Sequence, residues 1–183
     1  RNRCAIAGTA RQATPKLKLT ASALASFNRI GSWTQFFDVY DEAGSYLESV
    51  PRAFADVEPL LTPRAIVNVA VDFSPRPWLQ AGVSGRDVAE SYLDNTNADA
   101  MTTPSFYEMD GSLSVGLERF IRAGRPRLRL QVGNLFDHRR IWPSGYSYLF
   151  LTREAPGREV VGQTAYYYPL ATRSVLVFLD LSL

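Results

Sequence analysis

Residues 65–73 read AIVNVAVDF, a stretch in which every second residue is apolar. Successive side chains of a β-strand point to opposite faces, so a period of two predicts a strand rather than a helix. The apolar positions would share one face: Ala65, Val67, Val69, Val71 and Phe73. Asn68 and Asp72 would lie on the other face. This stretch therefore predicts a strand with one apolar face and one more polar face.

The same alternation recurs along the chain. Clear examples are residues 16–27, 79–84, 109–118, 127–132 and 174–183, and a weaker one is 3–12, where small residues blur the pattern. Together with residues 65–73 these make seven predicted strands. The last strand is expected to begin as early as Tyr166 and to be about 60 Å long, at about 3.3 Å per residue. Because no segment has a strong period of about 3.6 residues, the chain is predicted to be all-β.

The connections between the predicted strands alternate in length. Short ones are predicted at residues 12–15, 74–77 and 121–126, each containing proline, and long ones at 28–63, 87–104 and 137–163. Proline suits a turn because its φ is fixed and it has no N–H to satisfy. In a sheet of consecutive antiparallel strands, this alternation places all short turns at one end and all long loops at the other. That sidedness is typical of outer-membrane β-barrels.

The composition excludes several classes of protein. With 46% hydrophobic and 21% charged residues the chain is expected to fold, and a scattered net charge of +2 does not favour nucleic acid as a partner. No stretch approaches the roughly 18 consecutive apolar residues of a membrane-spanning helix. Cys4 is the only cysteine and His138 the only histidine, so no disulfide, His-based triad or multi-histidine metal site is expected. No catalytic residue, metal ligand or cofactor is predicted, and neither Cys4 nor His138 has an assigned role.

Several segments resemble the C-terminal part of TonB-dependent receptors. Residues 128–137 read LRLQVGNLFD, which is similar to the penultimate strand of that family and its closing NLFD. Residues 166–173, YYYPLATR, resemble the family's entry into its final strand. Similar segments upstream are TPR at 62–64, LDNT at 93–96 and PSFYEMD at 104–110, so the resemblance covers about residues 60–183. One departure is the last residue, Leu183, where family members commonly have an aromatic residue.

The resemblance implies an antiparallel up-and-down transmembrane β-barrel of about 22 strands. Residues 1–183 would supply about seven C-terminal strands, whereas the domain that plugs the barrel would be absent from this chain. The chain starts at Arg1 without a signal-peptide pattern and is expected to be a piece of a longer protein. The implied location is the outer membrane of a Gram-negative bacterium. The implied partners are outer-membrane lipid, a small-molecule or metal-chelate ligand, and TonB through an N-terminal region not present here.

The family's function implies active import of a scarce nutrient, such as an iron-siderophore complex, cobalamin or an oligosaccharide, without enzymatic activity. Aromatic residues in the long loops are candidate ligand contacts, because flat rings give contact area with little loss of entropy. Six are singled out: Trp33, Phe37, Tyr40, Trp142, Tyr146 and Tyr148. The alternative is that these rings only pack loop against loop. Residues 94–99 alternate Asp and Asn, but they lack the glycine and distal glutamate of a calcium-binding loop.

Two other functions stay open at this point. A passive porin-type barrel would share the alternation and the sidedness but would have no plug. A soluble, carbohydrate-binding β-sandwich would bury the apolar face as its core. Aromatic residues at the edges of an apolar band would favour a membrane. The candidates are Phe73, Trp78 and Phe120 near the short turns and Phe27 near a long loop.

Overall fold

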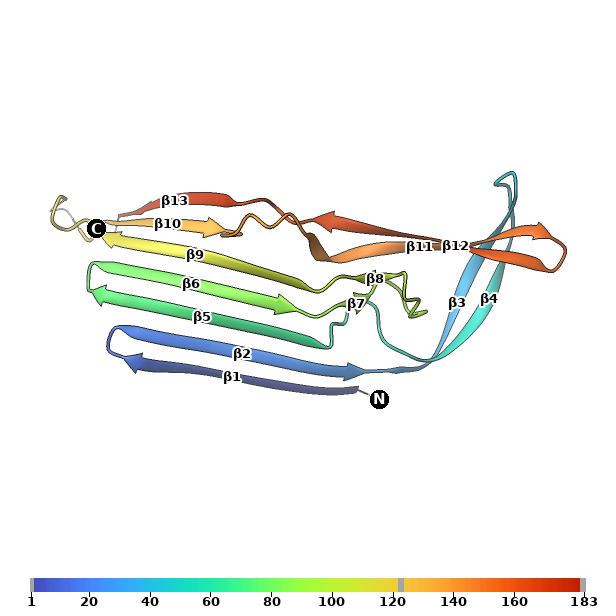
Figure 1. Ribbon diagram of the computed structural model, residues 1–183, viewed down its shortest axis with the longest axis horizontal. Coiled ribbons are helices and arrows are strands. Elements are labelled where there is room, and N and C mark those ends of the chain that lie inside the picture. The colour runs from blue at the N-terminus through green and yellow to red at the C-terminus, as the bar shows by residue number, and fades with distance from the viewer. Residues whose placement is uncertain (1, 122–123, 182–183) are drawn as a thin grey trace.

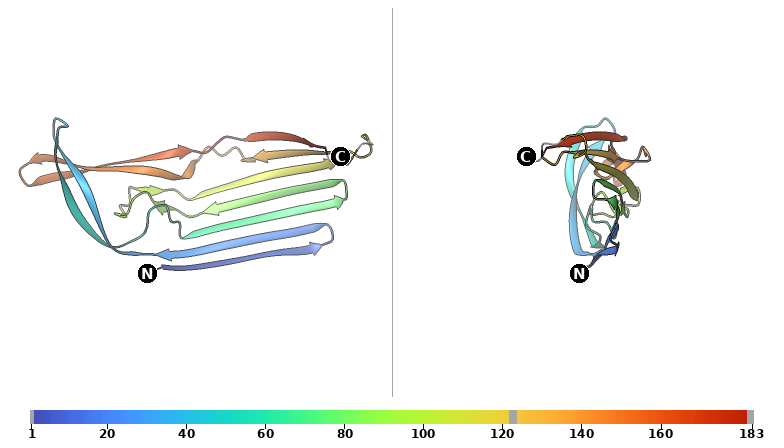
Figure 2. Two further views of the ribbon diagram at one scale, coloured as in Figure 1. Left: turned by 180° about the vertical axis from the view of Figure 1, so that it is seen from behind. Right: turned by 90° about the vertical axis from the view of Figure 1, so that its left-hand side faces the viewer.

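The computed structural model describes residues 2–121 and 124–181, and within them it contains thirteen β-strands and no helix. Seven long strands lie side by side, and two hairpins extend beyond one end of them (Figure 1). Seen from behind, both hairpins again project from that same end (Figure 2). The predicted all-β fold class is confirmed. No helix among the described residues is long and apolar enough to cross a membrane.

A seven-stranded sheet contains all seven of the predicted strands. Its members, in spatial order, are β1 (Asn2–Thr14), β2 (Leu17–Asn28), β5 (Ala65–Arg76), β6 (Leu79–Val88), β9 (Phe106–Gly116), β10 (Arg127–Gly133) and β13 (Ser174–Asp180). Every pairing in this sheet is antiparallel. The predicted antiparallel up-and-down arrangement is therefore confirmed for this sheet. The predicted end of the last strand, Ser182 and Leu183, lies outside the described residues.

The two ends of this sheet differ as the connection lengths predicted. The turns that join β1 to β2, β5 to β6 and β9 to β10 lie at one end, and the long connections lie at the other (Figure 1). The third turn is longer than expected, because β9 ends at Gly116 and β10 begins at Arg127. Residues 122–123 of the predicted turn at 121–126 lie outside the described part of the chain.

The register of the sheet collects like side chains on the same face. Leu19 pairs with Val71, and Val71 pairs with Val83. On the opposite face Ser84 pairs with Asp110. Because paired residues of neighbouring strands lie on the same side of a sheet, alternation in each strand becomes one apolar face and one polar face for the whole sheet.

The apolar face is exposed. Val69 is 50% exposed and Val177 is 64% exposed, so no other part of the described chain covers them. The four aromatic residues expected at the edges of an apolar band are exposed as well: Phe27, Phe73, Trp78 and Phe120. A β-sandwich formed by the described residues would have buried this face under a second layer. The structure contains no such layer among those residues.

Two of the three long connections are β-hairpins, which corrects the prediction that residues 28–63 and 137–163 are loops. β3 (Ile30–Asp41) and β4 (Tyr46–Val57) form the first hairpin, and β11 (Ile141–Ala155) and β12 (Arg158–Pro169) form the second. They join into a four-stranded sheet in the order β12-β11-β3-β4. Both hairpins are internally antiparallel, whereas β3 and β11 pair in parallel. The sheet has a small core of its own, built on Phe37, Val39 and Leu151.

The predicted final strand from Tyr166 to Leu183 is wrong as a single element. β12 ends at Pro169 and β13 begins at Ser174, and the two strands belong to different sheets. Proline has no N–H to donate to the ladder, so it suits the end of a strand. The next residue, Leu170, donates its backbone N–H to the carbonyl of Arg140 at 2.9 Å. The chain therefore leaves the hairpin sheet here and enters the seven-stranded sheet.

The second long connection packs against the first one. It contains only the short strands β7 (Ser91–Tyr92) and β8 (Thr102–Thr103), which pair with each other. Asn95 accepts the N–H of Leu60 through its side-chain oxygen at 2.8 Å. Asn97 donates from its side-chain nitrogen to the carbonyl of Glu58 at 2.9 Å. These bonds hold two connections together that are distant in sequence.

Two residues of the NLFD segment fix the connection between β10 and β13. The side chain of Asn134 donates to the carbonyls of His138 at 2.9 Å and Ala171 at 3.1 Å, and it accepts the N–H of His138 at 2.9 Å. Asn134 is 2% exposed and has a φ of 52°, a conformation that asparagine tolerates better than most residues. Asp137 accepts the N–H of Arg173 at 2.9 Å. The end of one strand is thereby bonded to the entry of the next.

We predict that Asn134→Ala lowers the free energy of unfolding by about 3 kcal/mol, because it leaves three partly buried backbone groups without their side-chain partner and places alanine at a positive φ. Equilibrium unfolding in urea measures this change. Asn134→Gly is the matched control, since it loses the same side-chain hydrogen bonds but tolerates the positive φ, and it should lose less. A change within about 0.5 kcal/mol for the alanine variant would contradict this role.

Candidate functional site

The six aromatic residues predicted as ligand contacts do not form one cluster. Trp33 and Phe37 lie on one face of the hairpin sheet, where Trp33 pairs with Phe54 and Phe37 pairs with Val50. The Phe37 ring is 4% exposed, and its centroid lies 6.4 Å from that of Phe54. Phe37 is thus a core residue of this sheet, and its ring is not accessible to a ligand in the structure.

Charged residues on the same face join the two hairpins. Arg153 of β11 contacts Glu48 of β4 at 2.6 Å and Glu159 of β12 at 2.9 Å. Arg52 of β4 contacts Glu159 at 3.0 Å, and its guanidinium carbon lies 5.7 Å from the centre of the Phe37 ring. The hydrogen bond from Arg153 holds the pKa of Glu159 below its usual value. This network links three strands across the parallel seam between β3 and β11.

The opposite face of the hairpin sheet carries a group of aromatic rings in contact. The register places Tyr40 opposite Tyr46, Tyr146 opposite Tyr166, and Thr152 opposite Tyr40. Tyr148 and Phe150 follow at every second position of β11 and therefore share this side. We call this group the aromatic face, and its members are Tyr40, Tyr46, Tyr146, Tyr148, Phe150 and Tyr166.

Ring contacts join the members of the aromatic face in two groups, one of four rings and one of two. Tyr40 meets Tyr46 edge to face at 6.0 Å and Phe150 edge to face at 6.0 Å between centroids. Phe150 lies 5.6 Å from Tyr148. Tyr146 and Tyr166 stack at 4.8 Å with only 13° between their planes. Three predicted contacts, Tyr40, Tyr146 and Tyr148, are therefore brought onto one surface.

A glycine allows one of these rings to lie against the neighbouring strand. Gly162 pairs with Phe150 across the ladder between β11 and β12. A Cβ atom built at Gly162 would overlap the Phe150 ring. The ring therefore occupies space that any other residue at this position would fill, and it stays within reach of Tyr40 and Tyr148.

The hydroxyl groups of Tyr40 and Tyr148 lie 3.4 Å apart, within hydrogen-bond distance. That hydrogen bond is the largest cause that raises the pKa of Tyr40 from 10.0 to about 12, and desolvation and the nearby Asp38 carboxylate add to it. The neutral phenol is therefore strongly favoured at neutral pH. Tyr40 therefore acts as an uncharged hydrogen-bonding group on this surface.

Trp142, the sixth predicted residue, lies apart at the boundary between the two sheets. Its ring meets that of Phe106 of β9 at 5.3 Å between centroids. It also lines a cavity of about 310 Å³ together with Ser84, Arg86 and Glu108, which belong to the polar face of the large sheet. Trp142 therefore extends the polar face of that sheet rather than the aromatic face.

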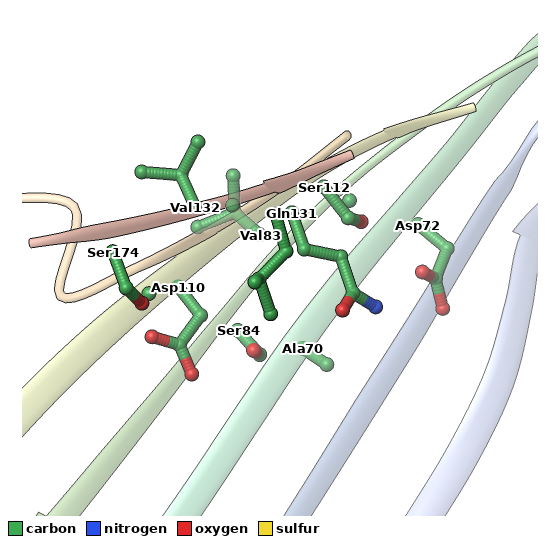
Figure 3. Close-up of a pocket in the computed structure, with 13 residues that line it drawn as sticks. Ala70, Asp72, Val83, Ser84, Asp110, Ser112, Gln131, Val132 and Ser174 are labelled. Carbon is green, nitrogen blue, oxygen red and sulfur yellow. The ribbon is translucent and has the colours of Figure 1, made fainter. Parts of the chain in front are cut away.

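The polar face of the large sheet forms a groove, although all predicted ligand contacts lie in the long connections. Residues of five neighbouring strands, β5, β6, β9, β10 and β13, line a cavity of about 350 Å³ on this face. Figure 3 shows the side chains around it. Its polar members include Asp72, Ser84, Asp110, Ser112 and Gln131. One Asp110 oxygen already accepts the N–H of Asn134 at 3.0 Å. The signal for this groove was present in the sequence, as the polar half of each alternation.

Neither Cys4 nor His138 forms a chemical site with other residues. Cys4 is an exposed free cysteine. The His138 ring lies 4.8 Å from that of Tyr107 and 5.8 Å from that of Phe136, between centroids, and its backbone is held by Asn134. Among residues 2–121 and 124–181, no group of three or more His, Cys, Asp or Glu side chains is placed to hold a metal ion.

The sequence matches no protein-family model and no curated protein. Among solved structures, the chain is similar to the open form of the ferric-catecholate import receptor Fiu from E. coli K12, with a TM-score of 0.49 and 16% identity. That match covers 98% of this chain and 26% of the receptor. The closed form of Fiu gives a TM-score of 0.47 and 15% identity, over 97% of this chain and 27% of the receptor. The chain spans about a quarter of the length of these solved structures.

We predict that Tyr148→Phe lowers the pKa of Tyr40 from about 12 toward 10.0, because it removes the hydroxyl that bonds to Tyr40. The measurement is an alkaline titration of tyrosine absorbance, with Tyr40→Phe subtracted to isolate the one group. Tyr146→Phe is the control, since its ring contacts Tyr166 instead, and it should leave the titration of Tyr40 unchanged. If the Tyr40 step in Tyr148→Phe, isolated by subtracting the double variant Tyr40→Phe/Tyr148→Phe, still titrates near 12, the hydroxyl pair is not formed.

Proposed function

We propose that this chain is the C-terminal part of the β-barrel of an outer-membrane TonB-dependent receptor, which binds a scarce nutrient and imports it. The observation that carries the proposal is the exposed apolar face of the seven-stranded sheet, with Val69 and Val177 uncovered. A soluble protein rarely leaves so extended an apolar surface in water. In a membrane barrel this face meets lipid, and the polar face lines the interior.

The open edges of the sheet support a larger barrel. Within the described residues β1 pairs only with β2, and β13 pairs only with β10. Each strand therefore has one edge of backbone N–H and carbonyl groups without a strand partner. In hydrocarbon such groups must be paired, so the proposed barrel needs further strands of the same protein on both sides. Residues 1–183 would then supply seven strands, and the plug and the TonB-contacting region would lie elsewhere in the protein.

The sidedness of the connections supports an orientation. The short turns would face the periplasm, and the hairpins β3–β4 and β11–β12 would stand on the outside of the cell. In the NLFD segment, Asn134 donates a hydrogen bond to the carbonyl of Ala171, and Asp137 accepts one from the N–H of Arg173. These bonds connect the end of β10 to the entry of β13. Their partners, Ala171 and Arg173, belong to residues 166–173, the segment that resembles the family's entry into its final strand.

The proposed mechanism needs no catalytic residue. The outer hairpins would capture a small-molecule or metal-chelate ligand, and TonB would supply the force that moves the plug. The groove lined by Asp72, Asp110 and Gln131 would face the barrel interior, where these polar side chains would contact water, the plug or the ligand. This segment by itself would not transport.

We predict that deleting the complete gene abolishes uptake of one nutrient, and that the full-length protein restores it only in cells that contain TonB. Uptake is measured with labelled ferric catecholates, cobalamin and neutral oligosaccharides in separate assays. A full-length variant without its TonB-contacting segment is the control, and it should reach the membrane without restoring uptake.

Restored uptake that does not depend on TonB would instead indicate a passive porin-type barrel. A full-length protein that stays monodisperse without detergent would contradict the membrane assignment, and would return the soluble carbohydrate-binding sandwich as the leading alternative.

A further inference from the structure

We infer that the aromatic face of the two outer hairpins binds a neutral oligosaccharide. The inference rests on the proposed function, because it names the class of ligand that the receptor would capture. The surface and its chemistry are properties of the hairpin sheet, however, and they can be tested by binding alone.

The first argument is the extent of the ring surface, which consists of two groups of rings on the same face of β11. Tyr46, Tyr40, Phe150 and Tyr148 form a chain with neighbouring centroids 5.6 to 6.0 Å apart. The stacked Tyr146 and Tyr166 extend it along β11 and β12. Tyr146 is 53% exposed and Tyr148 is 49% exposed, so their rings are open to a ligand. Several rings in a row suit an extended ligand of repeated units better than a single compact one.

The second argument is charge. The basic residues of β3, β4, β11 and β12 are Arg52, Arg153 and Arg158. Arg52 and Arg153 lie in the ion-pair network on the opposite face. Arg158 lies at the hairpin tip, 3.1 Å from Glu154. On the aromatic side Asp38 adds a carboxylate close enough to raise the pKa of Tyr40.

This charge distribution argues against an anionic ligand. Carboxylates and phosphates are recognised in proteins by arginine and lysine, which give charge-assisted hydrogen bonds. A ferric catecholate complex carries several negative charges, and here it would meet neutral rings and a nearby carboxylate. The surface is therefore suited to an uncharged ligand.

The third argument is the combination of rings with hydroxyl groups. A sugar ring has an apolar face of C–H groups and a rim of hydroxyls, so it can lie flat on an aromatic ring while its rim forms hydrogen bonds. The tyrosines supply both parts, since each has an apolar ring and a polar tip. Thr152 and Thr164 pair with Tyr40 and Tyr148, which places further hydroxyls beside the rings.

The surface is also held in place before binding. Its rings stand on β-strands, and the ion pairs of Arg153 and Arg52 tie the strands together from behind. Rings whose positions are fixed in advance lose less entropy on binding, which favours affinity. The aromatic face is in this respect a preformed site rather than a flexible loop.

The test uses the full-length receptor in detergent and isothermal titration calorimetry. The probes are maltohexaose, cellohexaose, laminarihexaose and xylohexaose, with the ferric tris-catechol complex as the anionic comparison. We expect at least one hexasaccharide to bind with a Kd below about 1 mM. Tyr146→Ala and Tyr148→Ala should each weaken that binding about tenfold or more, while the ferric complex should not bind at this face.

The matched control is Tyr167→Ala, because Tyr167 lies between Tyr166 and Tyr168 on β12 and points away from the aromatic face, with its hydroxyl 3.0 Å from the carbonyl of Thr102. It should leave hexasaccharide binding unchanged. Sedimentation of the same variants checks whether the aromatic face instead joins two copies of the receptor. A loss of self-association in Tyr146→Ala and Tyr148→Ala, without a loss of sugar binding, would overturn the inference.

Two further results would overturn it. One is that none of the four hexasaccharides binds, and the other is that sugar binding is equal in the wild-type protein and both tyrosine variants. TonB-dependent uptake of a different nutrient, with no sugar binding, would remove this inference and leave the proposed function intact. Sugar binding by a protein that stays soluble without detergent would remove the proposed function and leave this inference intact.

Discussion

The register of the seven-stranded sheet determines which side chains share each of its two faces. Because side chains alternate with a period of two, a slip of one residue in any strand would exchange its apolar and polar sides. The apolar face of Val71 and Val83 and the groove around Asp110 exist only while all pairings keep their observed partners. Several features support that register. They are the short turns at one end, the hydrogen bond of Asn95 to Leu60 between two long connections, and the hydrogen bonds of Asn134 and Asp137 before the last strand.

The two hairpins form a second sheet, and the two faces of this sheet differ in another way. Their sheet buries a small core around Val39 and Leu151 on one face and leaves aromatic rings on the other. The parallel seam between β3 and β11 brings together residues more than a hundred positions apart, and it is supported by the ion pairs of Arg153. The aromatic face is thereby built from two hairpins and could not be formed by either one alone.

The seven strands of the large sheet could be predicted because each one separates apolar from polar residues. The hairpins could not, since β3 carries aromatic residues on both faces, as in the adjacent Phe36 and Phe37, and its pattern does not alternate. The same ambiguity explains the candidate site. Phe37 and Tyr40 differ by three positions and so lie on opposite faces of the strand, and only the long-range pairing with β11 reveals which of them is buried. The break at Pro169 could not be predicted, because residues 166–173 resemble the family's entry into its final strand. Only the separate pairings of β12 with β11 and of β13 with β10 reveal two strands.

In the proposed barrel, one face of the large sheet meets lipid and the other meets water. Spin labels in the full-length protein in lipid bilayers test it most directly, with Cys4→Ser to remove the native thiol. Labels at Val69 and Val177 should collide with oxygen dissolved in the lipid, and labels at Ser84 and Ser112 should collide with a water-soluble nickel chelate. Equal exposure of all four positions to the nickel chelate would contradict a lipid-facing side of the sheet, and with it the proposed membrane barrel.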